Sequence, residues 1–345
     1  MNNAYLLTLD PFAIQFSESF GIRWYGLAYL AGFLAGYLII LWLLKKPGML
    51  MPRYLVEDFI FSIAIGCIVG GRLGYCLFYA PSLLTDFRSE IPFWGVLAVN
   101  EGGMASHGGI IGIILAGVYF SWRHRIPFLH LGDLVIFGAT LGITFGRIAN
   151  FINGELVGRV CNGSCLFPVK FPQDILTWPL YAPDKLSSLA PVVEKLGIDG
   201  ATWANMFFHG ENSQIAGVLH RVIGGVQAGN QELQEALRLV LIARHPSQLY
   251  AALLEGFVLF ALLFWVWRKP RRPGLIMGLF LFLYPIMRIF TEAFREPDLH
   301  LGYQLLGLSR GQWLSVAMFL LTATFLVWIY RSQADKIGGW MRSSS

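Results

Sequence analysis

Residues 131–158 read LGDLVIFGATLGITFGRIANFINGELVG, an apolar run that closes with Arg147, Asn150, Asn153 and Glu155. About 20 apolar residues span a bilayer, so this run is long enough to lie in one. A charge at the bilayer centre costs about 2.5–3.5 kcal/mol even on lenient insertion scales. A membrane helix that keeps an arginine, two asparagines and a glutamate at its end therefore indicates that these side chains have a function.

The composition of the whole chain is that of a membrane protein. Hydrophobic residues make up 55% of the 345 residues and charged residues 14%, with a mean hydropathy of +0.57. Soluble domains carry about 25% charged residues. The net charge of +5 does not indicate nucleic acid as a partner, because the basic residues lie in short loops between apolar runs. The first basic residue is Arg23, so we expect no cleavable signal peptide, which would begin with a basic region.

We predict an all-α polytopic membrane protein with about seven transmembrane helices. Inside the apolar runs glycines recur every four residues, which is typical of small-xxx-small helix packing. These glycines are Gly32/Gly36, Gly66/Gly70/Gly74, Gly108/Gly112 and Gly138/Gly142/Gly146. The candidate spans are 22–44, 57–80, 107–122, 131–153, 247–267, 275–295 and 311–330, of which the third is short.

Every second connection between these spans is basic, as an alternating topology requires. By the positive-inside rule the basic connections are cytoplasmic, so the N-terminus is expected in the periplasm and the C-terminus in the cytoplasm. The basic residues in question are Lys45, Lys46 and Arg53, then Arg123 and Arg125, then Arg268, Lys269, Arg271 and Arg272, and finally Arg331, Lys336 and Arg342.

The segment 159–245 is polar and contains no span. By parity we expect a periplasmic head domain there, between spans four and five. It would separate residues 1–158, with transmembrane helices 1–4, from residues 246–345, with helices 5–7 and a cytoplasmic tail. Within it, the stretch Gln231–Arg244 is amphipathic at helical spacing. This helix is expected either to pack on the domain or to lie on the membrane surface.

The four cysteines form two pairs of different kinds. Cys67 and Cys76 lie in an apolar run and are expected to be buried thiols, whereas Cys161 and Cys165 lie in a polar segment and could pair in an oxidising compartment. Zinc is only weakly indicated, since no second Cys or His pair sits at ligand spacing. We expect no metal and no cofactor.

Polar residues from several spans fall at one depth. Arg72, Arg147 and Arg288 lie about 13–16 residues into spans that start inside, which is roughly 20–24 Å at 1.5 Å per residue. That places them in the outer half of a core about 30 Å thick. Residues Tyr25, His107 and Glu255 lie near the outer ends of other spans. The pattern predicts a cavity open to the outer leaflet, where arginines would hold the phosphate of a phospholipid headgroup.

Each of these residues also has a structural interpretation. Arg147 could form a salt bridge with Glu155 or with another span, and Arg288 could form a local i,i+4 pair with Glu292. His107, Tyr25 and Arg72 could be structural or interfacial. Glu57, Asp58 and Asp133 are expected in the first turns of their helices, where the helix dipole favours carboxylates.

Several segments of the sequence carry a resemblance to a known family. They are Gly146–Gly158, Trp24-Tyr25-Gly26, Gly71–Tyr75, His107–Gly112, His245–Tyr250, and the face Tyr284/Arg288/Glu292, which continues to Arg295-Glu296-Pro297-Asp298. Together they resemble the prolipoprotein diacylglyceryl transferases of the bacterial inner membrane. The resemblance covers all seven spans, but the head is longer than expected, Cys161 and Cys165 are not part of the pattern, and Ala105-Ser106 stands where Ser-Phe is expected.

The resemblance implies a reaction and a set of roles. The diacylglyceryl group of phosphatidylglycerol would move to the thiol of the lipobox cysteine in a prolipoprotein signal peptide, releasing glycerol phosphate. The catalytic residues would be His107 as candidate base and Arg147 and Arg288 as a phosphate clamp, with Glu155 and Glu292 orienting the arginines. The substrate-binding residues would be Tyr25, Arg72, Asn150, Asn153, Gly154, Glu155, Tyr284 and Glu292.

Two other classes of protein also keep charges in membrane spans. A lipid or small-molecule transporter or flippase predicts a polar pathway through both halves of the membrane, but the inner halves of these spans lack comparable charge. An intramembrane protease needs a paired nucleophile and base, and Ser106 beside His107 is adjacent in sequence only.

Overall fold

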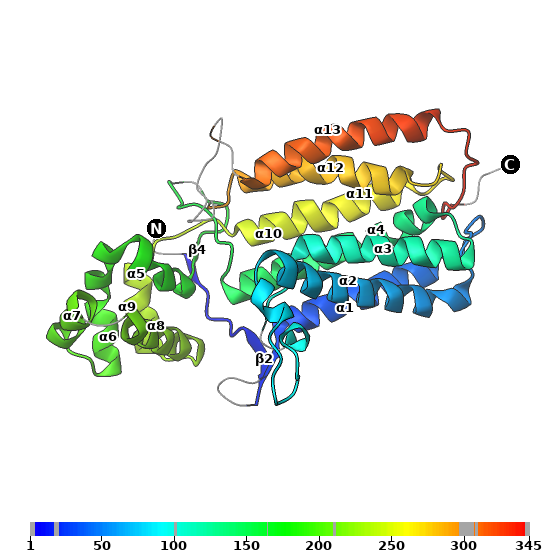
Figure 1. The fold of residues 1–345 in the computed structure, drawn as a ribbon. Helices are drawn as coiled ribbons and strands as arrows, with labels where there is room; N and C mark the ends of the chain where they lie inside the picture. Colours follow the sequence, from blue (N-terminus) through cyan, green and yellow to red (C-terminus); the bar gives the residue numbers. More distant parts are fainter. Residues whose placement is uncertain are drawn as a thin grey trace. The chain divides into compact units, whose positions relative to one another are not determined.

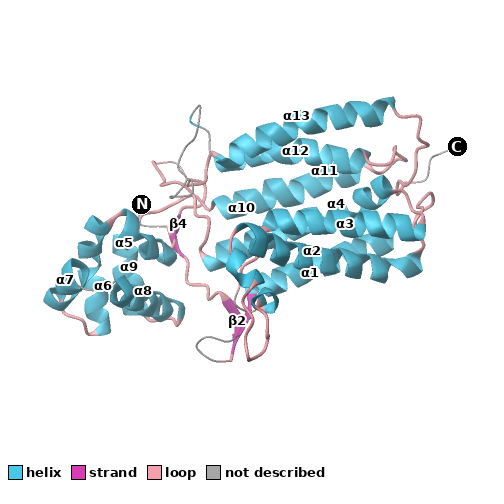
Figure 2. Cartoon of the chain, in the orientation of Figure 1, coloured by secondary structure: helices cyan, strands magenta, loops and turns pink. Residues whose placement is uncertain are grey.

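The computed structural model describes residues 4–16, 21–99, 102–163, 165–209, 212–296, 307 and 310–341. Pro297 and Asp298, the end of the matched 295–298 segment, lie outside the described residues. Helices dominate, and the strands are short (Figure 2). Strand β1 (Tyr5–Leu6) pairs in parallel with β4 (Val169–Lys170), and β2 (Phe12–Gln15) pairs antiparallel with β3 (Gly21–Arg23).

Six helical stretches of the described chain are long and apolar enough to cross a membrane, which confirms six of the seven predicted spans by length and composition. The other candidate, 107–122, forms helix α3 (Ser106–His124), which is not among the six. It carries Ser106 and His107 at one end and Arg123 and His124 at the other, which lowers its hydropathy. The six are α1 (Trp24–Leu43), Arg53–Phe78 with α2 (Val56–Phe78), α4 (Phe128–Asn153), Ser247–Val266, α12 (Leu275–Glu292) and Gly311–Arg331 within α13 (Arg310–Arg331).

The span Ser247–Val266 is not a uniform α-helix. It begins as α10 (Ser247–Ala251), continues as a π-helix (Ala252–Val258) and ends as α11 (Leu259–Val266). A π-helix bonds i to i+5 and frequently marks a functional site. Glu255 lies in the middle of this segment.

The chain forms two compact units. The first comprises Met1–Ala31, Ile143–Leu259 and Leu283–Leu320; the second comprises Gly32–Gly142, Phe260–Phe282 and Leu321–Ser345. The predicted borders at 158/159 and 245/246 both fall inside the first unit.

In the second unit, the predicted glycine packing is confirmed, whereas Gly146, which belongs to the first unit, has open space where a Cβ would lie. Helices α2 and α3 lie side by side (Figure 1), and a Cβ built on Gly112 would overlap the carbonyl oxygen of Gly66. On the other pair of helices, Gly36 of α1 faces Gly138 of α4 at 3.0 Å from its hypothetical Cβ to Cα. Small residues thus let the helix backbones touch, as in other membrane helix pairs.

Replacing Gly112 with valine is expected to force α2 and α3 apart. Overpacking of this kind costs about 1–3 kcal/mol, and here the obstacle is backbone, which cannot rotate away. The loss is measured as a lower unfolding midpoint of the purified protein in detergent. Gly224→Ala, at a position with open space around it, is the matched control and should not lower the midpoint. An unchanged midpoint in Gly112→Val would show that the helices do not pack through this glycine.

Asp133 corrects an expectation. Helix α4 begins at Phe128, so Asp133 is not in its first turn. Its buried carboxylate instead accepts hydrogen bonds from the backbone N–H groups of Gly274 (2.7 Å) and Met277 (2.8 Å) and so caps the start of α12. Glu57 and Asp58 do lie in the first turn of α2, as predicted.

In the first unit, residues 172–241 form a small helical cluster with its own core (Figure 1). Leu233, Leu237 and Leu241 are buried in that core, with Val240 packed against it. The amphipathic stretch therefore packs on the domain rather than on a membrane surface. The helices are η5 (Pro172–Thr177), α5 (Trp178–Tyr181), η6 (Pro183–Leu189), α6 (Ala190–Val193), η7 (Glu194–Leu196), α7 (Gly200–His209), α8 (Asn212–Gln227) and α9 (Gln231–Val240).

Candidate active site

A buried carboxylate joins the two arginines that the sequence singled out. Glu255 is fully buried, and its two oxygens lie 3.1 Å from Arg147 and 3.4 Å from Arg288. The hydroxyl of Thr291 donates a short hydrogen bond to the same carboxylate. Arg147 thus pairs with another span, one of the two structural alternatives, and Glu255 holds three helices together at this point.

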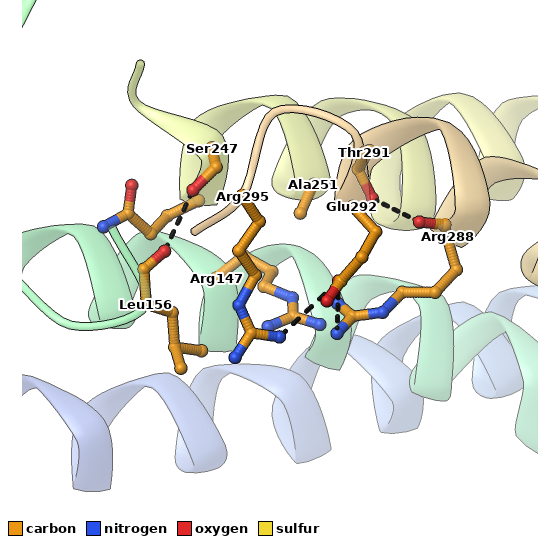
Figure 3. A pocket seen from close by; sticks show the side chains of 9 residues that line it. Arg147, Leu156, Ser247, Ala251, Arg288, Thr291, Glu292 and Arg295 are labelled. Atoms are coloured by element: carbon orange, nitrogen blue, oxygen red, sulfur yellow. Dashed lines mark hydrogen bonds and ion pairs between the residues drawn. The ribbon is translucent and has the colours of Figure 1, made fainter. Parts of the chain in front are cut away.

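A second carboxylate extends the cluster along α12. Glu292 pairs with Arg288 at 3.0 Å and with Arg295 at 3.6 Å, so the predicted i,i+4 pair is confirmed. Figure 3 shows the guanidinium groups of Arg147, Arg288 and Arg295 converging around Glu292. Three formal positive charges therefore share two negative ones, which leaves one positive charge in a largely buried place.

These side chains line a small cavity, of about 10 Å³, in the first unit (Figure 3). A volume of this size holds about one water molecule. An anion placed in this cavity would meet guanidinium groups, each of which carries five N–H donors. The residues that line the cavity are Arg147, Leu156, Ser247, Gln248, Ala251, Arg288, Thr291, Glu292 and Arg295.

A separate polar network lies at the end of α4. Tyr25 donates a hydrogen bond to Glu155 at 3.0 Å, and the amide of Asn150 makes a short hydrogen bond to the Tyr25 hydroxyl. The amide of Asn153 reaches the other oxygen of Glu155 at 3.5 Å. We expected Glu155 to orient the arginines, but Glu255 and Glu292 occupy that place, and Glu155 contacts Tyr25 and the asparagines. Tyr284 hydrogen-bonds to Arg147 from α12.

Gly154 ends α4 with a positive φ of 67°, a conformation that glycine adopts without strain. The chain that follows is fixed by the start of the next span. Ser247 donates to the carbonyl of Leu156 (2.9 Å), and Gln248 donates to the carbonyl of Glu155 (2.5 Å). The end of the matching segment Gly146–Gly158 (the signature) is thereby held in one conformation beside the arginine cluster.

Arg244 is a residue whose role sequence reasoning missed. Its guanidinium pairs with Asp174 (3.1 Å) and Glu296 (3.2 Å) and donates to the carbonyl of Gly158 (3.2 Å). It therefore ties the segment after the signature to the head and to the end of α12. The only sequence signal was its place directly before His245–Tyr250.

Arg72 and His107 lie in the second unit. Arg72 is buried and donates to the backbone carbonyls of Gly95, Val96, Gly102 and Gly103 at 2.5–3.0 Å. It thus holds the loop before α3. His107 is exposed at the start of α3. Their roles toward substrate stay predictions.

Cys161 and Cys165 form a disulfide, so the predicted pairing is confirmed. A ring nitrogen of His245 and the two sulfurs lie within 4.8 Å of one another. The disulfide uses both sulfurs, and this donor set is then not a zinc site, which requires thiolates. Cys76 is a buried thiol, whereas Cys67 is half-buried.

Comparison with known proteins identifies the family. A sequence profile described as prolipoprotein diacylglyceryl transferase matches residues 11–328. The chain belongs to the prolipoprotein diacylglyceryl transferase family. A phosphatidylglycerol–prolipoprotein diacylglyceryl transferase of Bdellovibrio bacteriovorus is 49% identical over 341 residues, which cover 97% of each chain. One of Burkholderia cenocepacia is 37% identical over 331 residues, covering 94% of this chain and 96% of its own.

Membership in the prolipoprotein diacylglyceryl transferase family resolves two open points. The chain is a transferase, as predicted, rather than a transporter or an intramembrane protease. The match to the Bdellovibrio bacteriovorus relative covers nearly the full length of both chains. The long head is therefore shared with that transferase and is not an addition foreign to the family.

Proposed function

We propose that this chain transfers the diacylglyceryl group of phosphatidylglycerol to the cysteine thiol of a prolipoprotein. The observation that supports it most is the cluster of Arg147, Arg288 and Arg295 with Glu255 and Glu292, which leaves one formal positive charge. The phosphodiester of phosphatidylglycerol carries one negative charge. The single net positive charge of the cluster matches the single negative charge of the phosphodiester, so the site is neutral once the lipid is bound.

The reaction is a displacement at a saturated carbon. The thiolate sulfur attacks the glyceryl carbon that carries the phosphate, a carbon–sulfur bond forms, and the carbon–oxygen bond to phosphate breaks. The electron pair leaves with glycerol phosphate. Arg147 and Arg288 stabilise the charge that develops on the leaving phosphate, while Glu255 and Glu292 hold them in place. Tyr25, Asn150, Asn153, Gly154, Glu155, Tyr284 and Arg72 are proposed to position the lipid.

A free thiol has a pKa near about 8.5, so the site has to promote the thiolate. His107 is the candidate base, and the positive field of the arginines also favours the anion. If His107 takes the proton, His107→Asn is expected to lower kcat about 10²-fold or more and to abolish the acidic limb of the pH–rate profile. Transfer rates measured from pH 5 to 9 decide this. An unchanged profile would leave the thiolate to the arginines alone.

The membrane setting is part of the proposal. The seven-span topology, with the N-terminus and the head in the periplasm and the C-terminus in the cytoplasm, rests on the positive-inside pattern. We propose that the enzyme lies in the bacterial inner membrane, as the resemblance to its family implies, and that the signal peptide presents its lipobox cysteine near the outer surface. The head, 159–245, then stands on the side from which glycerol phosphate leaves.

The direct test uses the purified protein, phosphatidylglycerol labelled in the glyceryl carbons of its diacylglyceryl group, and a synthetic lipobox peptide. Label is expected to appear on the cysteine as a thioether that resists mild base, and glycerol phosphate is expected in equal amount. A lipobox peptide with serine in place of cysteine is the matched control and should stay unlabelled. Label that crosses the bilayer without reaching the peptide would favour a flippase and contradict the proposal.

A further inference from the structure

Three amide side chains around Gly154 carry polar atoms that are buried and lack a hydrogen-bond partner in the described part of the chain. They are Oδ1 of Asn153, both amide atoms of Gln173 and Oε1 of Gln248. Asn153 is 7% exposed and Gln248 is 2% exposed. Buried polar groups are nearly always paired, because an unpaired one keeps its full desolvation cost. Four such atoms lie around the short segment 153–155 and indicate a binding site for a polar ligand.

The amide of Gln248 has a defined orientation. Its nitrogen donates to the carbonyl oxygen of Glu155 at 2.5 Å, and a flipped amide would set two oxygens against each other. The unpaired atom is therefore an acceptor. Asn153 is held similarly, with its nitrogen 3.5 Å from a carboxylate oxygen of Glu155, so its unpaired oxygen is an acceptor as well.

Gln173 reaches the same place from the head. It belongs to η5 (Pro172–Thr177), and its amide packs against Gly154, where any Cβ would overlap it. The missing side chain of Gly154 thus makes room for Gln173. This contact brings one side chain of the head domain directly onto the signature of the membrane helix.

The chemistry of these atoms selects a kind of ligand. Three amide oxygens accept hydrogen bonds and one amide nitrogen donates them. A phosphate offers only acceptors and would be repelled by the oxygens, whereas a hydroxyl both donates and accepts. Gln248 also lines the cavity of Arg147 and Arg288. Phosphate at the arginines and hydroxyl groups at the amides together describe a polyol phosphodiester.

The geometry points to an amide subsite, made of Asn153, Gln173 and Gln248, that binds the free hydroxyl groups of the lipid headgroup. Gln173 and Gln248 are then specificity-determining residues, and the head contributes to substrate recognition. The inference rests on the proposed function, because it assigns the glycerol end of the same lipid. A site built to hydrogen-bond a hydroxyl rejects the analogue that lacks it.

The test compares phosphatidylglycerol with phosphatidylethanol, which keeps the phosphodiester but has no free hydroxyl. The wild-type protein is expected to prefer phosphatidylglycerol by tenfold or more in kcat/KM. Gln173→Met and Gln248→Met are each expected to reduce that preference about tenfold, by slowing phosphatidylglycerol alone. Gln227→Met is the matched control, since its amide donates to the carbonyl of Leu9 at 3.2 Å, away from the site, and it should keep the full preference.

Stability separates recognition from folding. An unpaired buried amide carries a desolvation cost that an apolar side chain of similar size does not, so Gln173→Met should keep the unfolding midpoint while it loses lipid preference. An equal fall with both lipids, together with a lower midpoint, would make these amides structural and overturn the subsite. An unchanged lipid preference with a raised KM for the lipobox peptide would assign them to the peptide instead.

Binding can be tested without turnover. Dihexanoyl phosphatidylglycerol should raise the unfolding midpoint of the wild-type protein more than dihexanoyl phosphatidylethanol does, and the difference should vanish in Gln173→Met. If the wild-type protein transfers no lipid and this difference is still seen, the proposed function fails and the subsite stands. Equal shifts with both lipids would overturn the subsite whatever the protein transfers.

Discussion

Alanine in place of Arg147 or Arg288 is expected to lower kcat/KM for transfer from phosphatidylglycerol about 10²–10³-fold. Both guanidinium groups are largely buried and already oriented by Glu255, so they stabilise the leaving phosphate without rearrangement. Removing one preorganised donor of this kind costs about 2.7–4 kcal/mol in other enzymes. The effect should be in kcat as much as in KM, because the charge on the leaving oxygen grows toward the transition state.

Lysine variants sharpen this prediction. Arg147→Lys keeps the charge but cannot make two parallel hydrogen bonds to a phosphate, so its activity should lie between those of the wild type and Arg147→Ala. The double variant Arg147→Ala/Arg288→Ala should lose less than the product of the single losses, since the residues act as one clamp. Full activity in either alanine variant would remove the clamp from the mechanism.

Replacing Glu255 with leucine is expected to destabilise the protein by about 3–5 kcal/mol, because it leaves two arginines buried without their shared counter-charge. Glu255 is fully buried, and solvent cannot substitute for it. The loss is measured as a lower unfolding midpoint in detergent, and transfer activity should fall with it, because the clamp loses its orientation.

Glu232→Gln is the matched control. Glu232 pairs with Lys195 at 3.2 Å, but its side chain is 73% exposed, and exposed pairs contribute about 0–1 kcal/mol. If Glu255→Leu unfolded at the same midpoint as the wild type, the arginines would have to be solvated, and Glu255 would not be the counter-charge on which the cluster depends.

Hydropathy and residue spacing predicted six of the spans, because about 20 apolar residues in a row have few alternatives to a membrane helix. The glycine contacts of α1 with α4 and of α2 with α3 were equally predictable, since a spacing of four places small residues on one helix face; Gly146 has the same spacing but no such contact. The third candidate was the uncertain one, and α3 indeed falls outside the six apolar stretches.

The sequence could not predict which side chains of different helices form ion pairs and hydrogen bonds with one another. Which carboxylate reaches Arg147 depends on how each helix is rotated, and the π-helix over Ala252–Val258 alters that rotation in a way that residue spacing does not reveal. Asp133 posed the same problem, because it caps a helix far along the chain. Pairing of Cys161 with Cys165 depended on distance in space, which the sequence left open.

The π-helix limits how the length of the span Ser247–Val266 can vary. One residue more than an α-helix needs is accommodated between Ala251 and Leu259, so the residues before and after it follow two different registers. Each residue turns an α-helix by about 100°, and loss of a single residue there would swing Glu255 away from both guanidinium groups while the span kept its length and hydropathy. The position of Glu255 against the two arginines therefore depends on the number of residues in this part of the helix. Insertions or deletions there are expected to disturb the clamp more than most substitutions.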